Sequence, residues 1–282
     1  MEYTLNIRGQ LMSLNEPLVM GILNVTPDSF YAGSRMQTER EVADRAHQIV
    51  NEGGGIIDIG ACSTRPGSAP VSEEEEMARL RMALSVVRRE LPEAVVSVDT
   101  FRPDVARMAV EELGADIIND VGVPASPLGS GAPLVKEQPS MLRMVSRLRV
   151  PYILMSAEPT LRDTLLFFAE QVQRLRDMGH NDIILDPGFG FGKTLEQNYA
   201  LMAELEKLQV MELPILVGVS RKSMIYKLLN LTPDDVLKGS TALHAVALMK
   251  GASILRVHDV KEAVECCKVM AALMSLHRRT NE

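Results

Sequence analysis

The chain has 282 residues, of which 46% are hydrophobic, so it is long and apolar enough to bury a full core. Its formal net charge of −7 excludes a broadly basic face for nucleic acid, and an anionic ligand would need cations gathered locally. Its apolar runs are far shorter than a membrane span, and residues 1–10 (MEYTLNIRGQ) lack a signal-peptide pattern, so we expect a cytoplasmic protein that binds neither nucleic acid nor membrane.

Short runs rich in valine and isoleucine alternate with longer amphipathic stretches along the chain. The runs are, in order, 18–25, 55–60, 94–99, 115–120, 150–155, 182–186, 214–220 and 252–258. The amphipathic stretches include 38–53, 73–91, 103–113, 160–178, 194–209 and 260–278. Strands that are apolar along nearly their whole length are buried on both faces, which indicates a parallel sheet.

Eight strand–helix units in a chain of this length are typical of a (β/α)8 TIM barrel, and we expect residues 1–282 to form one such α/β domain. A doubly wound sheet is the alternative fold. One irregular zone, residues 121–140, is dense in glycine, proline and serine and predicts a long loop after the fourth strand.

Most of the predicted strands end in polar or charged residues. These residues are Asn24, Asp58, Asp99, Asn119, Asp120, Asp186, Ser220, Arg256 and His258. Asparagine and aspartate also cap helices, so any one of them could have a purely structural role. A whole ring of them at the carboxyl ends of barrel strands, where barrel enzymes have their active sites, instead favours a ligand site.

The glycine-rich segment GFGFGKT, residues 188–194, follows the strand that ends at Asp186. It is not a phosphate-binding loop, because Pro187 stands where that motif needs its first glycine, and a dinucleotide fingerprint fails because its third glycine is missing. What remains is a turn that lets the backbone approach a ligand closely. Phe189 and Phe191 within it could pack in the core or form the wall of a site for a flat ring.

Two sets of polar residues are expected at the rim of the barrel. The first set comes from strands three, four, six and seven and consists of Asp99, Asn119, Asp186 and Lys222. It offers mostly acceptors, which suit a flat heterocycle rich in N–H groups, since each group left unpaired on burial costs about 1–3 kcal/mol. Ser220 could cap the helix that follows it or bind a carboxylate near the positive end of that helix.

The second set suits an anion. Arg256 and His258 are two positions apart on one strand and therefore share a face. Asn24 and residues 63–65 would join them, because strands eight, one and two are neighbours in a closed barrel. Asn24 could also serve as a single protein ligand for Mg²⁺, which keeps several of its waters and takes other ligands from phosphates.

Seven motifs, each at the end of a predicted strand, carry a family resemblance. In chain order they are GILNVTPDSF, STRPG, SVDT, IIND, ILDPGFGFGK, VGVSRKS and RVHDV. With them the chain resembles the dihydropteroate synthases over about residues 18–275. The resemblance implies a TIM-barrel transferase of folate biosynthesis that joins 6-hydroxymethyl-7,8-dihydropterin diphosphate to 4-aminobenzoate, giving 7,8-dihydropteroate and pyrophosphate. It also implies Mg²⁺, a homodimer and sensitivity to sulfonamides.

Carried over position by position, the resemblance assigns substrate-binding roles at the rim. The pterin would be held by Asp99, Asn119, Asp186 and Lys222, with Met155 packed on it. The diphosphate would be held by Asn24 with Mg²⁺, Thr64, Arg256 and His258, and Val257 is also assigned to substrate binding. The 4-aminobenzoate would be lined by Ser220 and Phe191, with Asp28 and Arg65 on mobile loops that close over it.

The resemblance further implies a dissociative substitution, in which Mg²⁺, Arg256 and His258 stabilise the charge that builds on the departing pyrophosphate. Asp99 would help to stabilise the methylene cation, and the neutral arylamine would attack without a strong general base. The residues assigned to catalysis are Asp99, Arg256, His258, Lys222, Asp28 and Arg65.

One departure from the family pattern follows the fifth strand, where this chain has LMSAEPT and the family often has a segment close to HMQG. A rival interpretation is a pterin-binding methyltransferase domain, of the kind that passes a methyl group from a folate to a corrinoid. It has no diphosphate to hold, so Arg256 and His258 would lack a purpose. A second rival is a non-catalytic barrel, which we would expect to have lost its charged rim.

Overall fold

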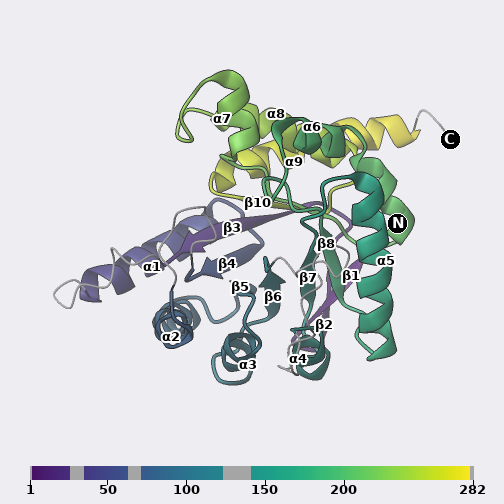
Figure 1. Ribbon diagram of the computed structural model, residues 1–282. Coiled ribbons are helices and arrows are strands. Elements are labelled where there is room, and N and C mark those ends of the chain that lie inside the picture. The colour runs from purple at the N-terminus through teal and green to yellow at the C-terminus, as the bar shows by residue number, and fades with distance from the viewer. Residues whose placement is uncertain (1, 26–34, 63–70, 123–140, 280–282) are drawn as a thin grey trace.

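Short parallel strands with helices around them make up most of the chain, as the computed structural model shows for residues 2–25, 35–62, 71–122 and 141–279 (Figure 1). The parallel strands are β3 (Leu18–Asn24), β4 (Ile56–Gly60), β5 (Val96–Asp99), β6 (Ile117–Asp120), β7 (Tyr152–Met155), β8 (Ile183–Asp186), β9 (Leu216–Val217) and β10 (Ile254–Val257). Each of the eight predicted runs contains one of these strands.

The helices lie on the outside of the strands (Figure 1). They are α1 (Arg35–Asn51), α2 (Glu73–Glu90), α3 (Pro103–Glu111), α4 (Met141–Leu148), α5 (Leu161–Asp177), α6 (Leu195–Ala203), α7 (Ser223–Leu229), α8 (Leu237–Met249) and α9 (Val260–Arg279). The helix predicted for 194–209 ends at Ala203, and a 3₁₀ segment, Leu205–Met211, follows it. No helix within the described ranges is long and apolar enough to cross a bilayer.

The strands form a nearly closed barrel. Their order is β8-β7-β6-β5-β4-β3-β10-β9, with every neighbour parallel. A single parallel bridge between Leu185, in β8, and Ile215, just before β9, brings the two ends of this order together, so the ring is nearly closed. The ring confirms the predicted TIM barrel and excludes the doubly wound sheet, whose edge strands do not meet.

A layer of apolar side chains fills the inside of the barrel. It is formed by Met20, Ile56, Ile117, Ile153, Ile184, Leu216 and Ile254, all fully buried. Since side chains alternate along a strand, the residue two positions further on also points into the barrel. In five strands that residue is Asp58, Asn119, Met155, Asp186 or Arg256. The fold therefore places a mostly polar layer directly above the apolar one, at the carboxyl ends of the strands.

An antiparallel hairpin that the sequence analysis did not predict packs on the apolar layer. It consists of β1 (Thr4–Ile7) and β2 (Gln10–Ser13). Its turn residues Arg8 and Gly9 have φ values of 51° and 81°, as a two-residue type I′ turn requires. Leu5 and Ile7 are buried against the inner layer of the barrel. The hairpin covers the amino end of the barrel and leaves the carboxyl end for the site.

An ion pair fixes the turn of this hairpin to the barrel. Arg8 Nε donates to Asp116 Oδ1 at 2.7 Å, and an Nη of Arg88 donates to Asp116 Oδ2 at 2.8 Å. Burial opposes ionisation of Asp116, but the hydrogen bonds from Arg8, the Val96 N–H and Arg88 outweigh it and lower the pKa of the carboxyl. The carboxylate therefore stays ionised and holds the hairpin in place at neutral pH.

Candidate active site

A buried group of three charges lies at the carboxyl end of the barrel. Arg256 Nε donates to Asp58 Oδ2 at 2.7 Å, and an Nη of Arg256 donates to Asp99 Oδ2 at 2.9 Å. Asn119 Nδ2 donates to the same Asp58 oxygen at 3.2 Å. Asp58 and Asn119 are fully buried. We call Arg256, Asp58 and Asp99 the ion triad, which connects β10 with β4 and β5.

The ion triad combines one cation with two carboxylates. Burial raises the pKa of Asp99 to about 7; Arg256 acts against that rise and Asp58 adds to it. Burial alone would lower the pKa of Arg256, but Asp58 and Asp99 raise it instead, so the guanidinium stays charged. Its positive charge is what permits two carboxylates to lie side by side in the interior.

Two buried oxygens in this group lack a hydrogen-bond partner among the described residues. They are Oδ1 of Asp58 and Oδ1 of Asn119. An unpaired buried acceptor costs about 1–3 kcal/mol, and a ligand that carries N–H groups would recover that energy. The site is therefore suited to a ligand with N–H groups on one edge, as the sequence predicted from its excess of acceptors.

A second charged pair lies at the ends of β8 and β9. Asp186 Oδ1 accepts a hydrogen bond from the N–H of Gly188 at 2.8 Å. The ammonium of Lys222 donates to the carbonyl of Phe189 and lies 4.5 Å from the centre of the Phe191 ring. Burial lowers the pKa of Lys222 to about 8 and raises the pKa of Asp186, and each group opposes the shift of the other. The aromatic ring and ammonium can thus bind a ligand beside Asp186.

The glycine turn after β8 is packed tightly against the atypical segment after β7. Gly188 has φ of 66°, and a Cβ at this position would lie only 2.1 Å from the carbonyl oxygen of Ser156. Lys193 Nζ donates to that same carbonyl at 3.2 Å and to the Gly188 carbonyl at 3.1 Å. Burial lowers the pKa of Lys193 to about 8. The segment is therefore held in place by a glycine and a lysine.

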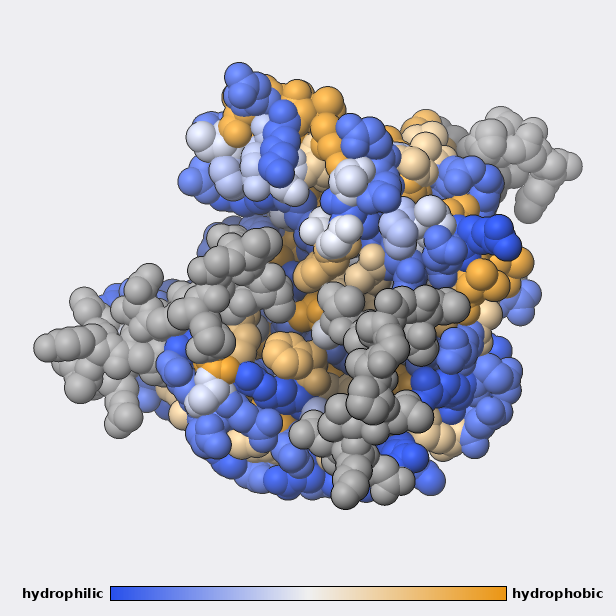
Figure 2. Space-filling model, in the orientation of Figure 1, coloured by the Kyte–Doolittle hydropathy of each residue, from blue (hydrophilic) through white to orange (hydrophobic). Residues whose placement is uncertain are grey.

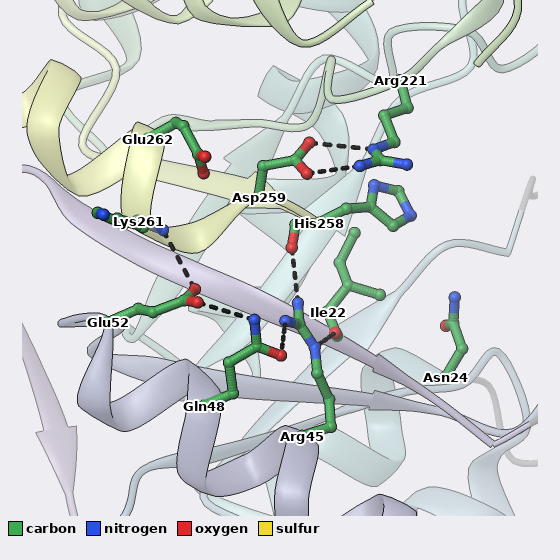
Figure 3. A pocket seen from close by; sticks show the side chains of 10 residues that line it. All are labelled: Ile22, Asn24, Arg45, Gln48, Glu52, Arg221, His258, Asp259, Lys261 and Glu262. Atoms are coloured by element: carbon green, nitrogen blue, oxygen red, sulfur yellow. Dashed lines mark hydrogen bonds and ion pairs between the residues drawn. The ribbon is translucent and has the colours of Figure 1, made fainter. Parts of the chain in front are cut away.

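A cavity of about 440 Å³ opens at the ends of β3 and β10 (Figure 3). Asn24 and His258 line it together with Arg45, from α1, and Arg221. His258 Nδ1 lies 3.3 Å from the hydroxyl of Ser220, which also accepts a hydrogen bond from the His258 N–H at 3.2 Å. Lys261 and the acidic residues Glu52, Asp259 and Glu262 also line it, so the cavity brings basic and acidic side chains together at the edge of the barrel mouth.

Asn24 is exposed and lines this cavity, and its side-chain amide carries an oxygen that can bind a cation. Mg²⁺ is commonly held by one or two protein oxygens, several waters and substrate phosphates. In the described parts of the chain, no group of three or more histidines, cysteines, aspartates or glutamates could hold a metal. The donor set fits a hydrated Mg²⁺ that arrives with a phosphate ligand, and it does not fit a metal held by protein alone.

The structure brings most of the predicted site residues to one end of the barrel. Asp99, Asn119, Met155, Asp186, Lys222 and Arg256 lie at the mouth, with Ser220, Asn24 and His258 at its edge. Val257 differs, because its side chain is buried between the barrel and the helices and cannot face a ligand in the mouth. The predicted residues Asp28, Thr64 and Arg65 lie outside the described residues.

Three residues that the sequence analysis did not assign take part in these contacts. Asp58 was noted only as a polar strand end, although its position two residues after Ile56 already predicts an inward side chain. Lys193 belongs to the glycine-rich segment that failed as a phosphate loop. Arg45 gives no signal in the sequence, because nothing in a helix repeat shows which strand end its side chain will reach.

Comparison with known proteins identifies the family. A family model described as pterin binding enzyme matches residues 20–258. A dihydropteroate synthase of Escherichia coli (strain K12) is 40% identical over 271 residues, which cover 95% of each chain. The chain belongs to the dihydropteroate synthase family. This agrees with the resemblance carried by the seven motifs.

Solved structures of the dihydropteroate synthase family share this barrel. The Xanthomonas albilineans dihydropteroate synthase with 4-aminobenzoic acid has a TM-score of 0.84 and 36% identity, with 97% of this chain and 99% of that chain covered. The Yersinia pestis dihydropteroate synthase in a sulfonamide drug complex has a TM-score of 0.82 and 38% identity, with 97% and 100% covered.

The contact between Gly188 and Ser156 gives a testable prediction. We expect Gly188→Ala to lower the free energy of unfolding by about 3 kcal/mol or more. The alanine would have to adopt a left-handed backbone conformation, and its Cβ would clash with the carbonyl oxygen of Ser156. Gly192→Ala is the matched control, since Gly192 has φ of 63° but its Cβ would lie 3.7 Å from the nearest atom. It should lose only about 1–2 kcal/mol. Urea unfolding measures both, and equal losses would show that the Ser156 contact does not matter.

Proposed function

We propose that this chain is a dihydropteroate synthase, which condenses 6-hydroxymethyl-7,8-dihydropterin diphosphate with 4-aminobenzoate to give 7,8-dihydropteroate and pyrophosphate. One observation carries the proposal: buried acceptors without partners lie at the carboxyl ends of β4 and β6, and the cavity at the ends of β3 and β10 contains Asn24, His258 and Arg45. A substrate with an N–H-rich ring and an attached diphosphate matches both features. The family assignment supports the same reaction.

The pterin would lie across the barrel mouth. Its ring N–H and amino groups would donate to the free oxygens of Asp58 and Asn119 and to the carboxylate of Asp186, all of which are buried. Lys222 would donate to the ring oxygen or nitrogen acceptors. Met155, buried next to Gly188, would pack against the face of the ring. Such a site selects a heterocycle by hydrogen bonds, because an analogue without these donors leaves buried acceptors unpaired.

The diphosphate would lie in the cavity at the ends of β3 and β10. His258 and the nearby guanidinium of Arg256 would attract its oxygens. The amide oxygen of Asn24 would hold a Mg²⁺ bound to the same diphosphate, and that ion would supply positive charge to the leaving group when bound. Thr64 and Arg65 are further proposed contacts of the diphosphate, and this part of the proposal comes from the sequence alone.

The reaction breaks the bond between the methylene carbon and the bridging oxygen of the diphosphate, and the electron pair leaves with pyrophosphate. The lone pair of the arylamine nitrogen forms the new carbon–nitrogen bond, and this nitrogen then loses one proton to water. Arg256 and His258 would stabilise the negative charge on pyrophosphate, and the Asp99 carboxylate would stabilise the positive charge on the methylene. An arylamine is neutral at pH 7, so it needs no strong general base.

Phe191 and Ser220 would border the site of 4-aminobenzoate, and Asp28 is assigned to that site from the sequence alone.

The two rival interpretations are less well supported. A methyltransferase domain would use the acceptors at the barrel mouth but would have no ligand for the cavity lined by Asn24 and His258. A non-catalytic barrel would not need the buried ion triad, which is costly to keep without a ligand to bind. The family assignment also favours the synthase.

We also propose a homodimer that forms through the last two helices. Val246 and Met249 on α8 are one helical turn apart, as are Val269 and Leu273 on α9, and α8 packs on α9. Met249 is 64% exposed and Val269 is 67% exposed, which is unusual for side chains of this size. Figure 2 shows further apolar surface over α7 and α8. A second copy of the chain would cover these residues.

Two further proposals follow from the sequence and the family. The first is that the protein is cytoplasmic, which is supported by its three cysteines, all free thiols, as the reducing environment of the cytoplasm favours. Sulfonamides, which resemble 4-aminobenzoate, would bind in its place beside Phe191 and Ser220, as the sulfonamide complex of the Yersinia pestis relative suggests by analogy.

The proposed reaction can be followed directly through its two products. With pterin diphosphate, 4-aminobenzoate and Mg²⁺, we expect pyrophosphate release, and we expect dihydropteroate only when the arylamine is present. Asp186→Asn should weaken pterin binding about tenfold or more, because a buried acceptor is lost. Asp177→Asn, an exposed change on α5, is the control and should have no effect. If no pyrophosphate appears under any of these conditions, the chain is not a synthase.

The proposed dimer predicts a species of twice the chain mass of 31.0 kDa in sedimentation equilibrium. Val269→Glu should convert it to monomer, because each copy would bury an unpaired charge. Leu166→Glu on α5 is a control of similar exposure, 60%, away from α8 and α9, and should leave the mass unchanged. A wild-type chain that sediments as a monomer would contradict the proposal.

A further inference from the structure

Arg45 joins the ends of two strands that carry predicted substrate-binding residues (Figure 3). It lies on α1, outside the barrel. Its Nε donates to the carbonyl of Ile22 at 3.2 Å, and one Nη donates to the carbonyl of His258 at 2.6 Å. The other Nη donates to Gln48 Oε1 at 2.9 Å. One side chain thus connects β3, β10 and α1 at the wall of the cavity.

The two carbonyls occupy a defined place in the sheet. The parallel pairing of β3 with β10 ends with Gly21 opposite Val257. Ile22 and His258 form the next pair of the same register, beyond the last pair of the ladder. The guanidinium of Arg45 binds both of their carbonyls and therefore holds the two strands together at the point where their own pairing stops. Asn24 follows only two residues after Ile22.

The guanidinium also brings positive charge to this wall of the cavity. Its three partners among the described residues are two carbonyls and an amide, so no direct ion pair cancels its charge there. Burial lowers the pKa of Arg45, while Glu52 and Asp259 act in the opposite direction from further away. A guanidinium remains protonated in proteins and has five N–H donors, of which these bonds use three.

The neighbours of Arg45 are themselves fixed. Gln48 Nε2 donates to Glu52 Oε1 at 2.7 Å, and the backbone N–H of Lys261, in the first turn of α9, donates to the other Glu52 oxygen at 3.3 Å. Asp259 accepts two hydrogen bonds from Arg221, at 3.0 Å and 2.6 Å. The network reaches from α1 to α9, so the Arg45 side chain has little freedom to move.

We infer that Arg45 is a positioning residue for the diphosphate: it fixes the backbone at Ile22 and His258 so that the side chains of Asn24 and His258 face one cavity. Its charge also offsets the charges of Glu52, Asp259 and Glu262, which line the same cavity, and this favours an anion there. This inference rests on the proposed function. It adds a residue from a helix outside the barrel to a site otherwise built from strand ends and loops.

Binding measurements on Arg45 variants test the inference. We expect Arg45→Gln to weaken pyrophosphate binding in the presence of Mg²⁺, and to raise the KM for pterin diphosphate, about tenfold each, while binding of 6-hydroxymethylpterin and the KM for 4-aminobenzoate change less than about twofold. Arg45→Lys keeps the charge but can reach fewer acceptors, so it should be intermediate. Arg40→Gln, on an exposed part of the same helix, is the control and should match the wild type.

The outcomes separate the inference from the function on which it rests. If wild-type protein makes no dihydropteroate, the proposed function itself fails. If the wild type is active and Arg45→Gln binds pyrophosphate as tightly, the role of Arg45 is overturned. An equal loss of pyrophosphate and pterin binding would also overturn it, because it would reflect general disruption of the barrel. If Arg45→Gln does not fold, the same comparison is made with Arg45→Lys.

Discussion

The site depends on one buried guanidinium. Arg256 pairs with Asp58 at 2.7 Å and with Asp99 at 2.9 Å, inside a barrel where an unpaired carboxylate would be strongly unfavourable. Because these partners come from β10, β4 and β5, the ion triad fixes three strand ends relative to one another. Asn119 is attached to the same group through Asp58. The geometry of the acceptors that face a ligand is therefore set before any ligand arrives.

The ion triad also explains how the two parts of the site relate. The sequence grouped Arg256 with His258 as cations for an anion, but the structure places Arg256 against carboxylates and His258 in the adjoining cavity. Arg256 thus pairs with the carboxylates of the barrel mouth and stands only two residues before His258 in the chain. In the proposed reaction, a leaving group that becomes more negative near Arg256 would draw on a charge that is already held in position, and such an arrangement lowers the barrier of charge separation.

The repeating pattern of the sequence was sufficient to predict the barrel, because strands buried on both faces have a strong signal. It also predicted the polar rim, since side-chain alternation alone places Asp186 and Arg256 in the mouth. It could not predict contacts between distant segments: Arg256 and Asp58 are 198 positions apart, and the hairpin at Arg8 depends on Asp116. Val257 was assigned by its place in a motif, whereas alternation turns its side chain away from the mouth.

A double-mutant cycle on Arg256 and Asp58, measured as free energies of unfolding, tests the ion triad most directly. Arg256→Met leaves Asp58 without its counter-ion, and Asp58→Asn removes the charge that needs one. The account predicts that the double variant is more stable than the sum of the single losses by at least about 1 kcal/mol. Losses that add within about 0.3 kcal/mol would contradict it, because the guanidinium would then not hold the carboxylate in place.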